Sequence, residues 1–368
     1  MKLVVLKNNF REGLSSIERA VAENNNLPIL KNVLIKTFNN KIQLSATNLE
    51  LAITKFISGK IIEEGSITVP LSTLLTIVNY TNNERINLEV ENNTLNFKTD
   101  NYKAVIQGLP EEEFPIIPKL ENLNNHLQLD SEIFKNGLIK VINAVQISEI
   151  RPEISGILLD FQVTNFKLVA TDSFRLAEKT FNESNFKSNF PRGFKIIIPL
   201  KTAQELLRIL SDGLITILID PNQILFKNDD LEIISRLIDG IYPDYEQIIP
   251  KSLETEINVD KDHFISAVKL VSTFSGKIND VKISIKNGDK SLEVYSANQY
   301  LGENKYLIPV KVKGPAFEVS FNWRYLMDGL KNFEAKELIF GVNGDNRPSV
   351  LKNQNDATYF YILMPIRS

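Results

Sequence analysis

Few side chains in this sequence have the types and spacing that catalysis or metal binding requires. The two histidines, His126 and His263, have no acidic or histidine neighbour at the spacing of metal ligands, so we expect both to be structural or solvated. Ser275-Gly276-Lys277 has the glycine and lysine of a phosphate-binding loop, but it lacks the upstream glycine and the Ser or Thr that would hold magnesium. These residues predict no nucleotide site.

Acidic residues are the remaining candidates for general acid–base chemistry. The run Glu111-Glu112-Glu113 is best interpreted as a solvated loop ahead of Phe114-Pro115. Asp172 and Asp244 could pair as acid and base, but both stand in turn-forming contexts where aspartate binds its own backbone. We therefore predict that the protein is no enzyme and uses no cofactor and no metal. The enzyme alternative is a carboxylate-dependent hydrolase built on repeats, which needs a convergent acidic site with perturbed pKa values.

Composition restricts the class of partner and the compartment. With 42 basic and 45 acidic residues the net charge is −3, which argues against a protein that grips duplex DNA by neutralising phosphates. The absence of cysteine excludes disulfides and thiolate metal sites and fits a reducing cytoplasm. No apolar run approaches the roughly 20 residues of a membrane span, and Met1–Leu6 leads into polar Lys7-Asn8-Asn9, so we expect no signal peptide. These features predict a cytoplasmic protein without membrane contact.

A ten-residue stretch recurs at a domain-sized distance. Ala46–Lys55 reappears as Ala170–Lys179, an offset of 171 − 47 = 124 positions between the two matched threonines. Leu292–Asn298 is a fainter third copy. Self-similarity of this period indicates a duplicated module. The sequence therefore predicts three modules, at residues 1–122, 123–253 and 254–368.

Each module shows the patterns of two amphipathic helices and several hairpins. The opening helices have apolar stripes at helical spacing, at Phe10, Leu14, Ile17 and Val21, at Phe134, Leu138, Val141 and Val145, and at Phe264, Val268 and Val271. Later helices are expected at 71–79, 201–210 and 323–333, each followed by an alternating hairpin, such as the one across Asn92-Asn93. A further hairpin turn is expected at Asn287-Gly288. The fold class is α+β, with two helices on one face of antiparallel sheet structure in each module.

Five motifs distributed in order along the whole chain together carry a family resemblance. They are Asn26-Leu27-Pro28-Ile29-Leu30, Ala170–Ala177, Tyr242-Pro243-Asp244-Tyr245, Phe321-Asn322 and Met364-Pro365-Ile366-Arg367. In this set the chain resembles the bacterial sliding clamp, the beta subunit of DNA polymerase III. The resemblance implies the DNA clamp fold and a processivity factor: a head-to-tail homodimer closing a ring of six modules around duplex DNA, with helices lining the hole.

The resemblance also explains how a protein with negative net charge can act on DNA. A ring needs no tight grip on phosphates, because threaded DNA is held topologically and weak contacts permit sliding. The basic residues that it implies on the inner helices are Arg11, Arg19, Lys135, Lys140, Lys201, Arg208, Lys261, Lys269, Arg324 and Lys331.

A peptide-binding pocket is the site that the resemblance implies most specifically. Its expected residues are Ile154, Thr171, Ser173, Phe174, Arg175, Leu176, Pro243, Ile248, Asn322, Tyr325, Ile362, Met364, Pro365, Ile366 and Arg367. Family members commonly have histidine at the position of Phe174. The expected partners are the replicative polymerase, the clamp loader and repair proteins, which dock short linear motifs, typically a glutamine followed by leucine and phenylalanine. A Met-Pro-Ile segment near the chain end should fray unless it docks, and Arg175 is expected to bond a peptide carbonyl or carboxylate.

The expected dimer contact uses an exposed strand edge. Tyr102–Gln107 has the pattern of an edge strand, and such edges must be paired, covered or blunted. The resemblance pairs it with the third module of a second copy, and the implied interface residues are Lys103, Val105, Gln107, Leu270 and Val271. The alternative is a clamp-fold paralogue that serves as a protein-interaction scaffold without encircling DNA, which the uncharged stretch Asn24–Asn26 leaves open.

Overall fold

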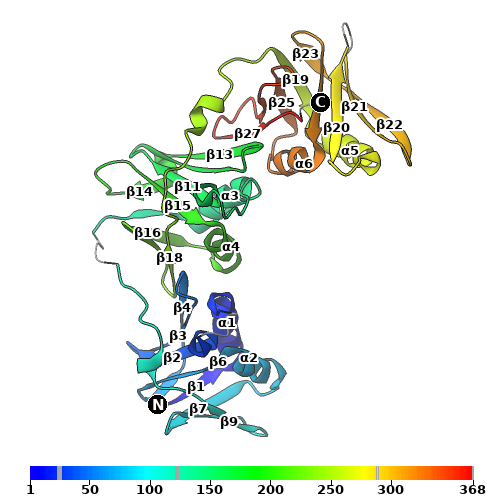
Figure 1. Cartoon of the computed structure of the whole chain (residues 1–368). Coiled ribbons are helices and arrows are strands. Elements are labelled where there is room, and N and C mark those ends of the chain that lie inside the picture. Colours follow the sequence, from blue (N-terminus) through cyan, green and yellow to red (C-terminus); the bar gives the residue numbers. More distant parts are fainter. Residues whose placement is uncertain (23–26, 121–123, 287, 289, 367–368) are drawn as a thin grey trace. The chain divides into compact units, whose positions relative to one another are not determined.

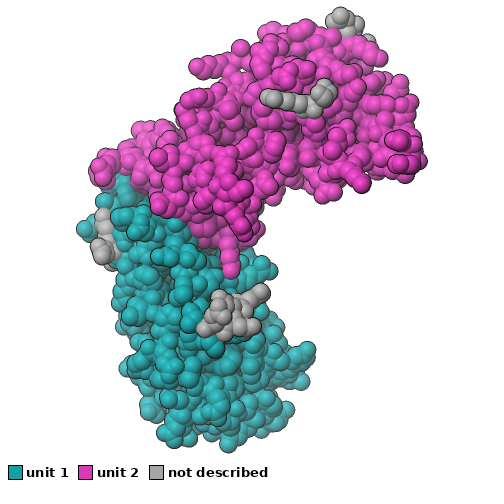
Figure 2. Space-filling model, viewed as in Figure 1, with its two compact units in different colours: residues 1–132, 186–190, 205–237 teal, residues 133–185, 191–204, 238–368 magenta. Residues whose placement is uncertain are grey.

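The computed structural model describes residues 1–22, 27–120, 124–286, 288 and 290–366, and Asn24–Asn26 lie outside them. The chain divides into two compact units (Figure 2). The first comprises Met1–Glu132, Phe186–Phe190 and Glu205–Leu237, and the second comprises Ile133–Asn185, Pro191–Gln204 and Ile238–Ser368. The middle third of the chain therefore contributes strands and helices to both units.

The first unit contains two antiparallel sheets (Figure 1). The five-stranded sheet has the order β5 (Lys60–Glu63), β1 (Lys2–Leu6), β7 (Arg85–Glu91), β8 (Thr94–Lys98), β9 (Lys103–Gln107). The nine-stranded sheet has the order β14 (Phe186–Ser188), β10 (Leu127–Asp130), β16 (Leu214–Asp220), β17 (Gln223–Lys227), β18 (Leu231–Arg236), β4 (Leu51–Ile57), β3 (Lys41–Thr47), β2 (Asn32–Phe38), β6 (Ser66–Pro70). Helices α1 (Lys7–Ile17) and α2 (Leu71–Tyr80) pack against each other, and α1 covers β3 and β4.

The second unit repeats this plan with a nine-stranded and a four-stranded sheet. The larger has the order β15 (Phe194–Pro199), β11 (Gly156–Phe161), β12 (Asn165–Thr171), β13 (Arg175–Asn182), β27 (Tyr359–Leu363), β26 (Ser349–Lys352), β25 (Glu337–Val342), β19 (Thr255–Asp260), β23 (Lys311–Lys313). The smaller has the order β22 (Gly302–Pro309), β21 (Ser291–Asn298), β20 (Asp280–Ile285), β24 (Phe317–Asn322). Helices α5 (Lys261–Val271) and α6 (Trp323–Lys331) pack together beside these sheets, while α3 (Ser131–Ile142) and α4 (Leu200–Ile209) contain the boundaries between the units.

The first opening helix has the predicted stripe but is shorter than predicted. Its buried side runs through Ile17, and a turn of 3₁₀ helix (Glu18–Ala20) follows, so Val21 lies beyond the helix. Gly13 is part of the buried side, and a Cβ atom there would lie 2.7 Å from Cδ1 of Leu44. The glycine therefore allows α1 to approach the sheet more closely than any side chain would permit.

The other predicted elements are present with small shifts of their ends. The stripes of the other opening helices are buried, namely Phe134, Leu138 and Val141 in α3 and Phe264, Val268 and Val271 in α5. Val145 is buried but lies past the end of α3. The hairpin β7–β8 turns at Asn92-Asn93, whose φ angles of 48° and 59° are those of a type I′ turn. Asn287 lies outside the described residues.

The ten-residue repeat builds the same turn twice. In the first copy the Thr47 hydroxyl donates to the Leu51 carbonyl over 3.1 Å, and Asn48 Oδ1 accepts from the amides of Glu50 and Leu51 over 3.0 and 2.8 Å. Leu49 has a φ of 76°, and Ser173, its equivalent in the second copy, has a φ of 75°. The repeated residues therefore form a hydrogen-bonded turn rather than a core motif.

Each repeated turn leads into a strand that joins two modules. Strand β4 pairs with β18 and places Leu51 opposite Ser235, and β13 pairs with β27 and places Arg175 opposite Leu363. The offsets are 175 − 51 = 124 and 363 − 235 = 128, so the two junctions have equivalent registers. We call β4·β18 the first junction and β13·β27 the second junction.

Two of the strands at sheet edges, β9 and β22, occupy equivalent places to strands of the first and second junctions. Strand β9 is the last strand of the five-stranded sheet, as predicted for an edge strand. It comes after β7 and β8 in its sheet, which is the place that β18 has after β16 and β17. Strand β22 ends the four-stranded sheet and follows β20 and β21 as β13 follows β11 and β12. A pairing of β9 with β22, which does not occur within the described chain, would correspond to the first and second junctions, and we call it the third junction.

Candidate functional site: a peptide groove at the second junction

The second copy of the repeated turn forms one rim of the candidate groove. The Thr171 hydroxyl donates to the Arg175 carbonyl over 2.7 Å and accepts from the Ser173 amide. Asp172 Oδ1 accepts from the amides of Phe174 and Arg175, both over 2.9 Å. This network fixes the turn and leaves Phe174, which is 59% exposed, projecting at its tip. Asp172 is therefore the turn-forming aspartate that the sequence predicted.

Arg175 makes several contacts within its own chain. Its Nε atom donates to Asp172 Oδ2 over 2.9 Å, and an Nη atom donates to Asp328 over 2.5 Å. Its guanidinium also lies 4.2 Å from the ring centroid of Tyr325. Burial by itself would lower the pKa of Arg175, but Tyr361, Asp328 and Asp172 outweigh it and raise the pKa. The side chain, 10% exposed, thus ties the turn to α6, and its contact with a partner peptide stays a prediction.

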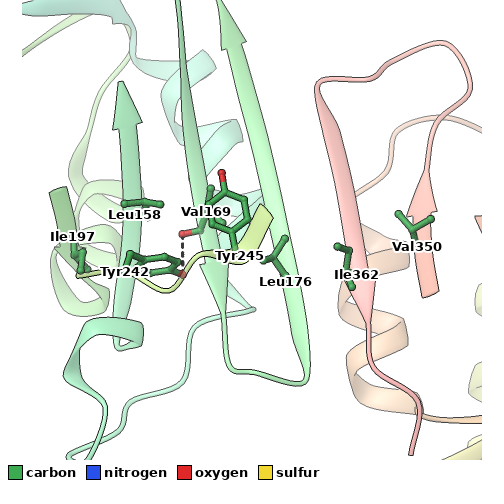
Figure 3. Close-up of a cluster of buried hydrophobic side chains, with 8 residues drawn as sticks. All are labelled: Leu158, Val169, Leu176, Ile197, Tyr242, Tyr245, Val350 and Ile362. Carbon is green, nitrogen blue, oxygen red and sulfur yellow. Dashed lines mark hydrogen bonds between the residues drawn. The ribbon is translucent and has the colours of Figure 1, made fainter. Parts of the chain in front are cut away.

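Beneath the candidate groove a cluster of buried apolar side chains spans the larger sheet of the second unit (Figure 3). Leu176 and Ile362 are cross-strand neighbours in the second junction and are fully buried. Tyr242 and Tyr245, from the segment that leads to the short helix Tyr245–Ile248, lie on the same surface, and the Tyr242 hydroxyl donates to the Val169 carbonyl over 3.4 Å. Leu176 and Ile362 therefore support the floor from within the core rather than offering exposed contact area.

The walls combine half-buried and exposed apolar residues. Pro243 is half-buried, and Ile248, at the end of the short helix, is 41% exposed. Ile154 is only 5% exposed, so it is a supporting residue. One rim residue that the sequence did not predict is Arg151, whose guanidinium donates to the Ser173 hydroxyl over 3.0 Å. The one feature of the sequence that could have pointed to Arg151 is its position three residues before the predicted wall residue Ile154.

The C-terminal segment docks along the groove through its backbone. The Met364 amide donates to the Phe174 carbonyl over 2.8 Å, and the Ile366 amide donates to the Ser320 carbonyl over 2.8 Å. The prediction that this Met-Pro-Ile segment docks is confirmed for the described residues, and Arg367 lies outside them. The side-chain oxygen of Asn322 caps α6 by accepting from the backbone amide of Arg324 over 3.0 Å. The Asn322 side chain therefore already has a structural role.

The ten basic residues implied to face DNA differ in their exposure. Lys140 donates to Glu334 and is 14% exposed, and Lys261 donates to the Phe333 carbonyl and is 18% exposed, so neither has a free ammonium group. Arg208 donates to the carbonyls of Ser15 and Ser16 at the end of α1. The remaining residues lie on or beside helices and are exposed or half-buried: Arg11, Arg19, Lys135, Lys201, Lys269, Arg324 and Lys331.

The residues implied for the dimer interface are exposed with one exception. Val105 is 56% exposed in β9, where Lys103 and Gln107 are also exposed, and Leu270 is 56% exposed on α5. Val271 is 1% exposed, because it belongs to the stripe by which α5 packs on its own module. It cannot form a surface contact, and its assignment to the interface is corrected.

The described residues contain no group of three or more His, Cys, Asp or Glu side chains placed to hold a metal ion. Among the same residues no helix has both the length and the apolar character to cross a bilayer. The fold is that of a modular protein built from repeated α+β units, with one apolar candidate binding site at the second junction.

Comparison with known proteins identifies the family. Models of the N-terminal, central and C-terminal domains of the DNA polymerase III beta subunit match residues 1–118, 128–244 and 246–367. The chain belongs to the DNA polymerase III beta subunit family, the sliding clamps of bacteria. Its function is that of the family, a processivity factor of DNA polymerase.

Relatives match over their whole length. The beta sliding clamp of Bacillus subtilis is 28% identical, with all of both chains covered, and that of Synechococcus elongatus is 27% identical, with 100% of this chain and 99% of the relative covered. The solved B. subtilis clamp superposes with a TM-score of 0.94 at 27% identity, covering 100% of this chain and 99% of that one. The clamp of Bartonella birtlesii, solved with bound griselimycin, gives 0.91 at 29% identity, with both chains fully covered.

Proposed function

We propose that two copies of this chain close head to tail into a ring of six modules around duplex DNA. The observation that carries the proposal is the pair of unmatched halves of the third junction, β9 and β22. A contact between unlike surfaces of identical chains closes a ring when its rotation permits, and pairing removes exposed strand edges. The predicted module boundaries, after residues 122 and 253, are part of this proposal.

The register of the third junction follows from the other two. Gln107 corresponds to Ser235, since 107 + 128 = 235, and Gly302 begins β22 as Leu51 begins β4. We therefore expect Gln107 opposite Gly302 of the second copy, with Lys103 and Val105 along the same pairing. Leu270 lies beside this edge, because its carbonyl accepts from the Asn304 side chain in β22 over 3.0 Å.

Contact with DNA is assigned to the exposed basic residues of the helices. Arg11, Lys201, Lys269 and Lys331 are exposed on α1, α4, α5 and α6, so all three modules contribute positive charge. Single exposed charges give weak, salt-dependent contacts, which suits a ring that slides. Lys140, Arg208 and Lys261 serve the internal structure instead.

The groove at the second junction is assigned to the partners, one groove per chain. The replicative polymerase, the clamp loader and repair proteins would dock short linear motifs there, with apolar anchors against Phe174, Ile248 and Met364. The protein would act in the cytoplasm, without a cofactor and without catalysing a reaction of its own.

Loading on circular DNA tests the ring directly. Labelled protein is loaded on a nicked circular plasmid by a clamp loader and passed over a sizing column, before and after cleavage of the plasmid at one site. Encirclement predicts retention on the circle and loss from the linear form at the same salt concentration. Equal retention on both forms contradicts the ring, and failure of loading, with groove binding intact, favours a clamp-fold scaffold that does not encircle DNA.

A further inference from the structure

The sheet face that carries the groove also carries a second cavity. It has a volume of about 320 Å³ and lies between strands β11 and β15 and the chain segment 240–246. Leu158 and Ile197 in its lining belong to the same buried cluster as Leu176 and Ile362 of the groove floor. In Figure 3 Tyr242 and Tyr245 lie between these two pairs of residues. We call this space the connector cavity. The Tyr242–Tyr245 segment lies between the connector cavity and the candidate groove, and the same buried apolar cluster lies beneath both.

Carboxylates prevail at the rim of the connector cavity. Asp244 and Glu246 line it, and Glu246 is 56% exposed although Lys167 lies 3.6 Å away. The lining lysine, Lys195, is already paired with the buried Asp160 at 3.1 Å. The opening therefore has surplus negative charge, which is complementary to a cationic group.

A buried hydroxyl and a buried carboxylate lie together beneath the cavity. The hydroxyl oxygen of Tyr245, which is 4% exposed and lines the cavity, and Oε2 of Glu178 both lack a hydrogen bond of normal geometry among the described residues. Burial, and after it the Glu178 carboxylate, raise the pKa of Tyr245, so the carboxylate adds further negative charge next to the lining.

We propose that the connector cavity binds an arginine or lysine side chain of the partner polypeptide whose motif occupies the groove, an inference that rests on the proposed function of the groove. The aliphatic stem packs on Ile241 and Pro243, above the buried Leu158 and Ile197, and the charged end meets Asp244 and Glu246. Because Tyr242 and Pro243 line the cavity and Pro243 is a groove residue, one extended peptide reaches both sites.

Four fluorescein-labelled peptides test the proposal by anisotropy. One holds a glutamine-leucine-phenylalanine motif alone, and two add an arginine through a flexible spacer at either end. The fourth peptide is the tighter-binding of these two extended peptides with its added arginine replaced by 2-amino-3-guanidinopropionate. This residue keeps the charge but carries it on a shorter stem. We expect one arginine extension to bind about three- to five-fold more tightly than the motif, and the short-stem peptide to lose this gain.

Two protein variants locate the effect. In Asp244→Asn with Glu246→Gln the gain should vanish while the motif alone binds as before. The control Asp345→Asn with Glu337→Gln removes the same charges from exposed positions of the second unit and should keep the gain. An equal gain with the short stem, no gain at all, or a gain that survives in the rim variant overturns the proposal. Failure of wild-type protein to bind the motif alone overturns the groove assignment and this inference with it.

Discussion

The first and second junctions have the same backbone and different surfaces. At both, a repeated turn with a residue in the left-handed region leads into a strand paired at an equivalent register. The second junction presents Phe174 beside Met364, whereas the first has Glu50 and Arg236 at these positions, joined by an ion pair of 3.3 Å. The hydrogen bond from the Met364 amide to the Phe174 carbonyl also has its counterpart, from the Arg236 amide to the Glu50 carbonyl over 2.9 Å.

This comparison separates what builds the module from what binds partners. The backbone pairing is required wherever two modules meet, so it recurs. Apolar side chains at an exposed rim are needed only where a peptide docks, and a charged pair at the same place keeps the other junction solvated. The groove is therefore a local change of side chains on a structural repeat, and exchanging those side chains tests it.

The largest effect is expected from removing the docked segment at the second junction. Met364→Ala with deletion of the residues after it removes several apolar contacts, and we expect affinity for a motif peptide to fall by at least about 100-fold. Arg236→Ala, the equivalent change at the first junction, should leave the affinity unchanged in the same anisotropy assay. A truncated protein that binds normally would place the partner site elsewhere.

A charge exchanged at the rim should have the next largest effect. Phe174→Glu introduces the residue of the first junction into the groove and should weaken peptide binding by about 10- to 100-fold, because an apolar contact is lost and a charge is desolvated. Glu50→Phe, the reverse exchange, should change peptide affinity little. Comparable losses in both variants, measured by calorimetry, would mean that the two junctions share the binding.

The third junction extends the comparison to the contact between two chains. Leu270→Asp places a charge beside β22 and should shift the dimer toward monomer by at least about ten-fold in dissociation constant, as measured by analytical ultracentrifugation. Val271→Ala serves as its control. It should lower the free energy of unfolding by roughly 1 to 3 kcal/mol and leave the dimer constant nearly unchanged. A dimer that tolerates Leu270→Asp would contradict the proposed edge.

These positions also show how far the sequence could predict the site. Thr171 and the turn-forming Asp172 repeat Thr47 and Asn48 in the sequence, so the turn at 171–175 could be predicted. The partner of Arg175 was not, because Asp328 lies 153 residues further along the chain and only the tertiary fold brings it near. Val271 was assigned to the surface by resemblance, although its own helical stripe with Phe264 and Val268 already pointed to the core.

The smallest predicted effect concerns the side chain that accepts the two backbone amides of each turn, Asn48 in the first and Asp172 in the second. Asp172→Asn gives the second turn the residue type of Asn48 and keeps the acceptor for two backbone amides, but it removes the charge that faces Arg175. We expect a loss of about 1 to 2 kcal/mol in urea unfolding, with peptide binding weakened only slightly. Asn48→Asp should stay within about 0.5 kcal/mol of wild type. A larger effect at Asn48 than at Asp172 would contradict the assigned role of Arg175.

Hydrogen–deuterium exchange of the whole protein with and without a saturating motif peptide tests the central claim most directly. Both junctions have the same backbone hydrogen bonds, so their exchange without peptide should be similar, and any difference on binding reports contact with the peptide. We expect new protection at 172–176 and 362–366 and none at 48–52 and 234–238. Protection at both junctions, or at the first alone, would contradict it.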